Sequence, residues 1–277
     1  MAAETSTVSA ARGPGRTDLV RFAAIELSIW SVVYGLYLAV RGVSIASPDE
    51  AFANARGVVD LERALGLFHE AGLQSAFGGL DEALSVYYLL GFAPLILGVL
   101  IWLGISHRPF YRELRTLLLV SIGVAVVVHV ALPVAPPRLL PGLGIADTVG
   151  LDHNHDSLFG IPFNPYAAMP SMHVGWSLLV GLVALKASRS PVVRGFFALH
   201  PAMMAISVTA TGNHYFLDSL AGALVALLAL GLLQVGPATR SSLCRAASRR
   251  RATSAATLPA IARISCRGSS VEDRIAA

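Results

Sequence analysis

Two polar stretches decide how this chain of 277 residues is interpreted: Asn164-Pro-Tyr-Ala-Ala-Met-Pro-Ser-Met-His173 and Thr211-Gly-Asn-His-Tyr-Phe-Leu-Asp218. They place His173, His214 and Asp218 where long apolar segments begin or end. An ionisable side chain at membrane depth is costly, so it indicates a functional site. We therefore expect these three residues to form one catalytic constellation with the upstream Arg138.

The composition is that of an integral membrane protein. Hydrophobic residues make up 55% of the chain and charged residues 14%, and the mean hydropathy is +0.64. A soluble domain carries about a quarter charged residues. The net charge of +4 comes from the end of the chain, where eight arginines of residues 237–277 face Glu272 and Asp273. The remaining body is slightly acidic, so no nucleic-acid partner is expected.

Six apolar segments predict an all-α fold, an integral membrane bundle of six transmembrane helices. They cover residues 19–40, 84–105, 114–134, 173–187, 195–210 and 215–235, and a helix needs about 20 residues to cross a membrane. The fourth segment is short, but its Pro-Ser lead-in can extend it. The first segment is too long for a signal peptide and contains Glu26. A signal peptide ending near Ser44-Ile-Ala46 stays the alternative.

The chain divides into three regions. Residues 1–18 are expected to be disordered, residues 19–236 to form the membrane-embedded domain, and residues 237–277 to form a disordered, arginine-rich cytoplasmic tail. Between the first two spans, Val58, Leu61, Leu65 and Phe68 recur at helical spacing. This pattern predicts an amphipathic helix lying on the membrane surface. A solvated connector packed on the bundle is an equal alternative.

Loop charges predict the orientation. Alternate connections hold nine basic residues, within residues 12–21, 108–115 and 186–194, against four on the other side: Arg41, Arg56, Arg63 and Arg138. Cytoplasmic loops carry the excess of Lys and Arg. Both termini are therefore predicted to be cytoplasmic and the two polar stretches extracytoplasmic, in a multi-pass protein of the plasma membrane.

The polar residues themselves predict acid–base chemistry. His214 and Asp218 are four residues apart at the start of a helix and so share one face. A carboxylate bonded to one imidazole nitrogen fixes the tautomer and leaves the other nitrogen as a nucleophile or acceptor. His173 opens the facing helix, where it can act as a general acid on a leaving oxygen.

An anion site accompanies the two histidines. Ser171 is placed as the N-cap of a helix whose exposed amides favour an anion. Arg138, in Ala135-Pro-Pro-Arg138, carries a guanidinium that suits bidentate phosphate recognition. Phosphoryl transfer needs positioning and charge stabilisation, and a covalent phosphohistidine would divide it into two easier steps. Tyr166 and Asn213 are substrate contacts or, equally well, a turn residue and a helix-start residue.

These residues resemble a known family. Pro170-Ser-Met-His173 and Gly212-Asn-His-Tyr-Phe-Leu-Asp218 are similar to the second and third motifs of the type 2 phosphatidic acid phosphatase superfamily. Pro136-Pro-Arg138, His173-Val-Gly-Trp176 and Thr211-Gly-Asn-His-Tyr215 resemble its inositolphosphorylceramide-synthase-like branch. The resemblance covers residues 25–235. It implies a six-helix bundle, a mechanism without metal or cofactor, His214 as nucleophile, Asp218 as its partner and His173 as the acid.

The sequence departs from the superfamily pattern in three places. Ser207-Val208 stands where Ser-Arg is usual, Met172 replaces a glycine, and the lysine of the first motif is absent. Fewer cations around the phosphate favour a phosphodiester or diphosphate donor over a simple phosphomonoester. Hydrolysis and transfer remain equal alternatives, because water or an alcohol can attack the same phosphohistidine.

The sequence thus predicts a membrane phosphatase or phosphotransferase that hydrolyses or transfers a phosphate or phospho-head group of a lipid at the extracytoplasmic face. The alternative function is a transporter or flippase that uses His and Asp for proton coupling. It would predict ionisable groups spread across the bilayer or inverted repeats, whereas these groups cluster at one face. His153-Asn-His-Asp156 resembles a metal patch but lies in a Gly/Asp-rich loop, so no metal site is expected.

Overall fold

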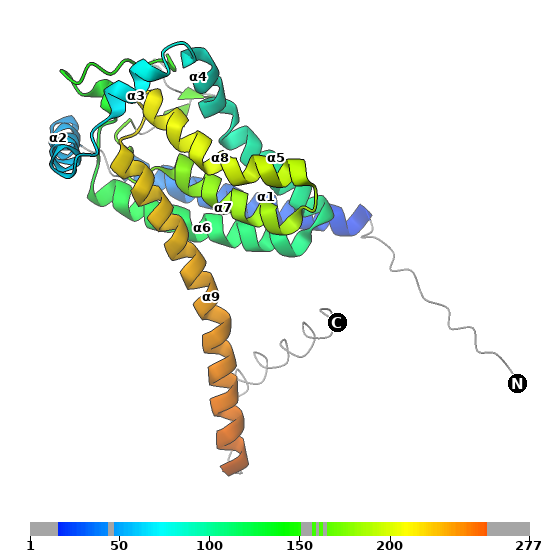
Figure 1. Ribbon diagram of the computed structural model, residues 1–277. Coiled ribbons are helices and arrows are strands. Elements are labelled where there is room, and N and C mark those ends of the chain that lie inside the picture. Colours follow the sequence, from blue (N-terminus) through cyan, green and yellow to red (C-terminus); the bar gives the residue numbers. More distant parts are fainter. Residues whose placement is uncertain (1–15, 44–46, 151–156, 159–160, 163–164, 254–277) are drawn as a thin grey trace, which may run out of the picture.

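The computed structural model describes residues 16–43, 47–150, 157–158, 161–162 and 165–253 (Figure 1). The described part is almost entirely helical, as the sequence predicts. Its helices are α1 (Arg16–Val43), α2 (Pro48–Leu65), α3 (Glu70–Ala76), α4 (Asp81–Leu90), α5 (Ala93–Ser106), α6 (Arg108–Ala131), a 3-10 turn (Pro137–Leu139), α7 (Met172–Ala187), α8 (Pro191–Ala210) and α9 (Phe216–Thr253). Strands β1 (Ser157–Leu158) and β2 (Ile161–Pro162) form one short antiparallel pair.

Several of these helices are apolar and long enough to cross a bilayer, which makes this a multi-pass membrane protein. Segments 17–36, 108–131, 191–210 and 216–234 each qualify alone. Helices α4 and α5 qualify together and are bent by 40° at their junction. Helix α7 has 16 residues, fewer than the about 20 that a straight span needs. The sixth span expected from the sequence therefore stays a prediction.

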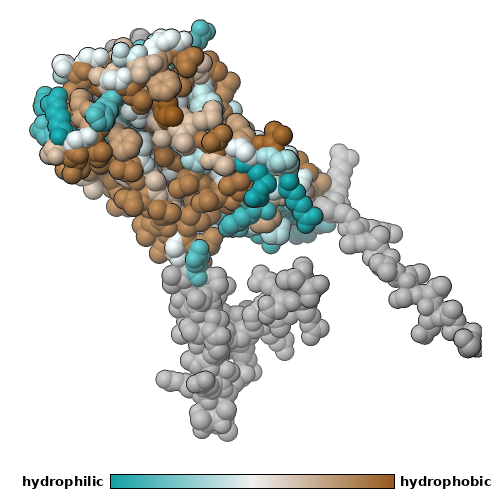
Figure 2. All heavy atoms as spheres, in the orientation of Figure 1, coloured by the Kyte–Doolittle hydropathy of each residue, from teal (hydrophilic) through white to brown (hydrophobic). Residues whose placement is uncertain are grey.

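The outer surface of the bundle is that of a protein embedded in lipid. Leu27, Leu97, Leu199 and Leu224 are 70%, 58%, 62% and 64% exposed on four different helices. Figure 2 shows hydrophobic residues covering the side of the bundle, while hydrophilic residues collect toward its two ends. This distribution follows from lipid solvation, because apolar side chains lose nothing by facing hydrocarbon.

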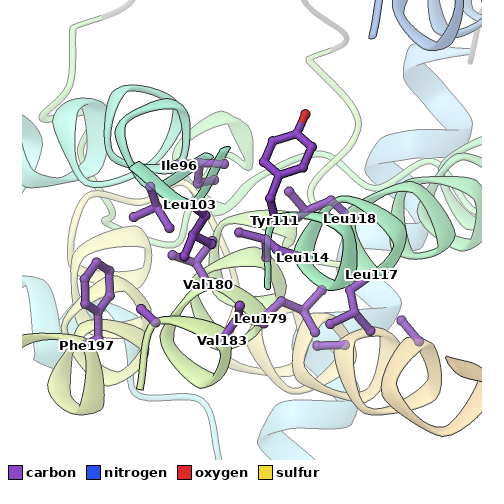
Figure 3. Close-up of a cluster of buried hydrophobic side chains, with 14 residues drawn as sticks. Ile96, Leu103, Tyr111, Leu114, Leu117, Leu118, Leu179, Val180, Val183 and Phe197 are labelled. Carbon is purple, nitrogen blue, oxygen red and sulfur yellow. The ribbon is translucent and has the colours of Figure 1, made fainter. Parts of the chain in front are cut away.

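Helix α7 lies at the centre of the bundle, packed between α6, α8 and α9 (Figure 1). Its residues Leu179, Val180 and Val183 are fully buried in the main hydrophobic cluster, which Figure 3 shows together with side chains of α5, α6 and α8. A helix that is hydrophobic on all sides belongs in the interior. This central position explains why the sequence of α7 lacks an amphipathic pattern.

Glycines bring α7 and α9 into unusually close contact. A Cβ added at Gly175 would lie 2.6 Å from the carbonyl oxygen of Gly222, and one at Gly222 would overlap the carbonyl oxygen of Ser171. Small residues at membrane helix contacts allow such close approach of two backbones. The crossing lies within one turn of His173 and fixes how near the start of α7 comes to the start of α9.

Helix α1 is attached to the bundle by a buried carboxylate. Glu26 is 7% exposed; its Oε1 lies 2.5 Å from Arg115 Nη1, and its Oε2 accepts a hydrogen bond of 2.9 Å from Tyr111. The ring of Phe22 also packs edge-to-face on Tyr111. These contacts connect α1 to α6.

Helix α2 packs on the protein with a face that shares only Val58 with the predicted apolar stripe. Of the expected stripe, Val58 is buried, but Leu61 and Leu65 are 51% and 57% exposed. The buried face instead consists of Ala51, Ala55, Val58, Val59 and Glu62. Small side chains let α2 lie close to the loop after α6, where Ala135 N–H donates to the carbonyl oxygen of Ala51 over 3.1 Å. Helix α2 therefore packs on the end of the bundle, and its exposed leucines leave the membrane-surface helix as a prediction.

Helix α1 begins at Arg16, and α9 continues to Thr253. Alanine and arginine are strong helix formers and are frequent in residues 237–253. The division of the chain into a membrane domain with two disordered ends stays a prediction. Residues 1–15, 254–277 and the histidine patch of 153–156 lie outside the described residues.

Candidate active site

The two histidines singled out in the sequence lie next to each other. His214 Nε2 is 3.3 Å from His173 Nδ1, although the residues are 41 positions apart. His173 belongs to the first turn of α7, and His214 belongs to the loop that leads into α9. The glycine crossing described above joins these two elements just beyond the histidines, so backbone packing sets the distance between the rings.

The other nitrogen of His214 faces two acceptors. His214 Nδ1 is 2.8 Å from the carbonyl oxygen of Ala168 and 3.4 Å from Asp218 Oδ2. A carbonyl oxygen can only accept, so Nδ1 carries the proton and Nε2 keeps its lone pair. From the sequence, Asp218 alone was expected to fix the tautomer of His214, without a choice between the two ring nitrogens. The nearer acceptor is a backbone carbonyl, for which a sequence carries no signal.

Asp218 has a second task at the start of α9. Its Oδ2 accepts a hydrogen bond of 2.8 Å from the backbone N–H of Tyr215, and its side chain is fully buried. Backbone amides at a helix start lack partners within the helix, and a carboxylate there is favoured by the helix dipole. The same carboxylate therefore orders the first turn of α9 and stands beside the His214 ring.

Aromatic rings hold His173. Its imidazole stacks on Tyr88 with ring centroids 4.6 Å apart and lies 4.0 Å from the ring centroid of Phe92. Both rings come from the region where α4 bends into α5. Tyr88 and Phe92 could not be predicted as neighbours of His173, because aromatic residues in an apolar segment are typical core residues.

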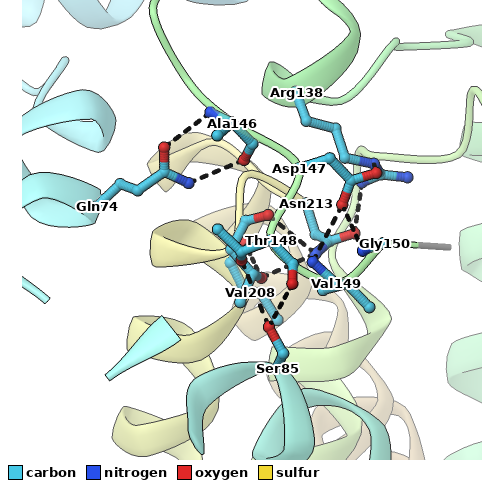
Figure 4. A network of polar contacts seen from close by, with 11 residues as sticks. Gln74, Ser85, Arg138, Ala146, Asp147, Thr148, Val149, Gly150, Val208 and Asn213 are labelled. Carbon is cyan, nitrogen blue, oxygen red and sulfur yellow. Dashed lines mark hydrogen bonds and ion pairs between the residues drawn. The ribbon is translucent and has the colours of Figure 1, made fainter. Parts of the chain in front are cut away.

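Arg138 is fastened to the loop that carries His214 (Figure 4). Its backbone N–H donates to the carbonyl oxygen of Gly212 over 3.0 Å, and its Nη1 donates to Asn213 Oδ1. Its Nε lies 3.5 Å from Asp147 Oδ2. The loop is tight here: Gly212 has φ 70°, and a Cβ would meet Ala146 O at 2.9 Å. Arg138 thus lies against the residues that precede His214, and Asp147 is an additional neighbour.

Asn213 shapes the same loop. Its Nδ2 donates to Thr211 Oγ1 over 2.8 Å, and its N–H donates to the carbonyl oxygen of Val208 over 3.0 Å. Gln74 of α3 secures the neighbouring chain by bonding Ala146 and the carbonyl oxygen of Ala210. These contacts favour the structural interpretation of Asn213, although its side chain also orients Arg138.

The two remaining predicted residues have separate surroundings. Ser171 is the N-cap of α7, and its N–H donates to the carbonyl oxygen of Asp218 over 2.9 Å. Its buried hydroxyl makes no hydrogen bond within the described part of the chain. Tyr166 packs edge-to-face on Phe52 of α2, with ring centroids 6.3 Å apart. Ser171 therefore contacts the first turn of α9 at Asp218, and Tyr166 lies toward α2.

A surface hollow adjoins the guanidinium. It has a volume of about 480 Å³ and is lined by Arg138, Leu139, Leu140, Pro141, Gly142, Gly144, Ile145 and Ala146. Among the described residues, no group of three His, Cys, Asp or Glu side chains is arranged to hold a metal ion. The arrangement offers a nucleophilic nitrogen, a second imidazole and a cation beside an open hollow, which are the groups that phosphoryl transfer requires.

Comparison with known proteins identifies the family. The family model of the PAP2 superfamily matches residues 56–232, which include both histidine motifs and Arg138. No curated protein and no solved structure matches the chain. The family match does not distinguish the inositolphosphorylceramide-synthase-like branch from the rest of the superfamily. Because the matched segment covers more than half of the chain and all of the site, this protein belongs to the PAP2 superfamily.

Proposed function

We propose that this protein is a membrane lipid-phosphate phosphatase or phosphotransferase that works through a phosphohistidine at His214. The observation that supports it most is the environment of that ring. Nδ1 is held by Ala168 O and Asp218 Oδ2, and Nε2 lies 3.3 Å from His173 Nδ1. A nucleophile oriented by acceptors on one side, with an acid–base group on the other, is the arrangement that covalent catalysis requires.

In the first step the lone pair of His214 Nε2 attacks phosphorus, while His173 is an imidazolium. An N–P bond forms, the bond from phosphorus to the leaving oxygen breaks, and the imidazolium of His173 gives a proton to that oxygen and becomes neutral. His214 becomes positively charged. The buried carboxylate of Asp218 and the carbonyl of Ala168, both next to Nδ1, stabilise this charge.

In the second step water or an alcohol attacks the phosphohistidine. The neutral His173 accepts the proton of the attacking hydroxyl, an O–P bond forms, and the N–P bond breaks. Water gives a hydrolysed product, and an alcohol gives a new phosphate ester. The same residues can catalyse hydrolysis and transfer, so the product depends on whether water or an alcohol is the acceptor.

The groups proposed to bind the phosphate are Arg138, the backbone amides at the start of α7 and the hydroxyl of Ser171. Arg138 already lies near a carboxylate, Asp147, which the oxygens of a substrate phosphate would replace. Val208, at the position where the superfamily usually has an arginine, is fully buried. With fewer cations at hand, a phosphodiester or diphosphate with further contacts in the hollow beside Arg138 is the favoured donor.

The site is proposed to face the extracytoplasmic side of the plasma membrane. Arg108 starts α6, Lys186 lies in the last turn of α7 and Arg194 in the first turn of α8, so these basic residues lie at the opposite end of the bundle from the histidines. An ion pair of 2.6 Å between Lys186 and Glu113 joins that end. By the positive-inside rule the basic end, and both termini with it, are cytoplasmic.

The direct test is turnover of lipid phosphates by the purified protein, with and without a polyol acceptor. Mass spectrometry would separate released phosphate from a transferred head group. We expect activity that survives a metal chelator and disappears in His214→Ala, while His107→Ala, at the opposite end of the bundle, stays active. An acid-labile, alkali-stable phosphoryl adduct should be trapped on His214. Full activity of folded His214→Ala would refute the mechanism.

A further inference from the structure

The segment of α2 and α3 does more than connect two spans, because its polar side chains reach into the loops of the site. Glu62 and Glu70 contact the start of α9, and Gln74 contacts Ala146 and Ala210. Glu62 and Glu70 are 0% and 1% exposed. Two buried glutamates that neither the catalytic steps nor the motifs use require a separate explanation.

Their partners are consecutive amides at the beginning of α9. Leu217 N–H donates to Glu62 Oε1 over 2.6 Å, and Phe216 N–H donates to Glu70 Oε1 over 3.1 Å. Tyr215 N–H donates to Asp218 Oδ2 over 2.8 Å. The three residues that directly follow His214 are thus each held by a buried carboxyl group. These amides have no acceptor within the helix, so the glutamates complete the first turn of α9.

The other oxygens of the two glutamates indicate a proton. Glu62 Oε2 and Glu70 Oε2 are both buried and have no donor among the described residues. Two carboxylates that share a dry site cannot both ionise at low cost. Burial raises the pKa of Glu62 to about 9; the hydrogen bond that protonated Glu62 can donate to Glu70, and the negative charges of Glu70 and Asp218, act in the same direction. The hydrogen bond from Leu217 acts in the opposite direction.

We propose that Glu62 and Glu70 are positioning residues, which hold the backbone after His214 as a carboxyl pair with one proton between them. This proposal rests on the proposed function of His214. The shared proton turns the repulsion of two carboxylates into a hydrogen bond that links α2 to α3. The pair holds the first turn of α9 against residues 48–76. Because His214 directly precedes this turn, the pair also fixes the position of the His214 ring.

The pair gives the enzyme a sensitivity to alkaline pH. Glu62 and Glu70 interact electrostatically with each other and with Asp218 of α9. The hydroxyl of Tyr215 also interacts with these three carboxyl groups. Loss of the shared proton would leave two carboxylates and Asp218 together at one helix start. We expect the turn that carries His214 to loosen, so that kcat falls at alkaline pH while KM changes little.

Four proteins test this: wild type, Glu62→Ala, Glu62→Gln and the control Glu50→Gln. Glu50 is an exposed residue of the same helix. Glu62→Ala leaves the Leu217 amide unpaired and should lower kcat at neutral pH by about 10- to 100-fold. Glu62→Gln keeps an acceptor for Leu217 and a donor for Glu70, so it should restore most of that kcat and move the alkaline fall to higher pH. Glu50→Gln should match wild type.

Infrared spectroscopy of the protein in detergent tests the proton without any substrate. Wild type at neutral pH should show the C=O stretch of a protonated carboxyl that disappears in Glu62→Gln and persists in Glu50→Gln. Absence of this difference would refute the shared proton, and a folded Glu62→Ala with unchanged kcat would refute the positioning role. If instead His214→Ala is as active as wild type, the proposed function fails, while the infrared result still decides the state of the pair.

Discussion

Substitution of Gly175 by alanine should separate the two histidines. Gly175 lies two residues after His173, where α7 crosses α9. Its added Cβ would be 2.6 Å from Gly222 O and 3.2 Å from Gly222 C. Both are backbone atoms of a helix and cannot rotate away. The start of α7 must therefore move relative to α9.

The size of the movement follows from the contact distance. Ordinary contact begins at 3.4 Å, and 3.4 − 2.6 = 0.8 Å is the gap that must open. If the start of α7 moves by this amount, the distance between His214 Nε2 and His173 Nδ1 increases from 3.3 Å to about 4 Å. A misplacement of about 1 Å at a reacting group can cost about 10²-fold in rate, which is about 2.7 kcal/mol of activation free energy.

Two further alanines separate this effect from a loss of stability. A Cβ at Gly181 of α7 would be 2.8 Å from Phe197 O, a similar overlap against α8 but farther from the histidines. Gly123 of α6 has open space around its Cβ position. Overpacking costs about 1–3 kcal/mol of stability, so Gly175→Ala and Gly181→Ala should both unfold at lower temperature than Gly123→Ala.

Activity should divide the three variants differently. Turnover of the lipid phosphate, measured for folded protein in detergent, should fall by about 10²-fold in Gly175→Ala and stay near the wild-type value in Gly181→Ala and Gly123→Ala. If Gly175→Ala turns over at the wild-type rate, the crossing of α7 and α9 does not set the distance between the histidines, and this reasoning is refuted.

Three other predictions concern single residues. Asp218→Asn should lower kcat on the order of 10²-fold but less than His214→Ala does, because Ala168 O still holds the Nδ1 proton at 2.8 Å; equal losses in kinetic assays would contradict this. Arg138→Lys keeps the charge but loses the planar fork, so KM should rise about tenfold with little change in kcat, and an unchanged KM would remove Arg138 from phosphate binding. The third concerns stability. The pKa of Glu62 is about 9 in the folded protein against an ordinary 4.5. The contribution of Glu62 to the free energy of unfolding is therefore complete below pH 4.5. It is lost as the pH rises toward 9, by up to about 1.4 kcal/mol per pH unit. Thermal unfolding in detergent should show a decline over this range that is flatter in Glu62→Gln, and parallel curves would disprove it.

The sequence by itself determined the class of protein and which polar residues were candidates for the site, namely His173, His214, Asp218 and Arg138. Apolar segments of bilayer length predict membrane helices because lipid solvates them without cost. The two histidine motifs led to the superfamily that the family match confirms. His173 and His214 each stand at the edge of an apolar segment, where an ionisable side chain is costly, and together with Asp218 and Arg138 they were predicted to form one site.

The tertiary structure decided how that site is built. Ala168 O holds His214 through a backbone atom, which no residue type announces. Helix α2 buries Glu62, which lies outside the apolar stripe of Val58, Leu61 and Leu65. The amide that Glu62 accepts from belongs to Leu217, 155 positions away. The periodicity of a helix predicts only which of its faces is apolar. It does not predict which backbone amide from a distant part of the chain will require one of its side chains as an acceptor, because that amide comes close only when the chain folds.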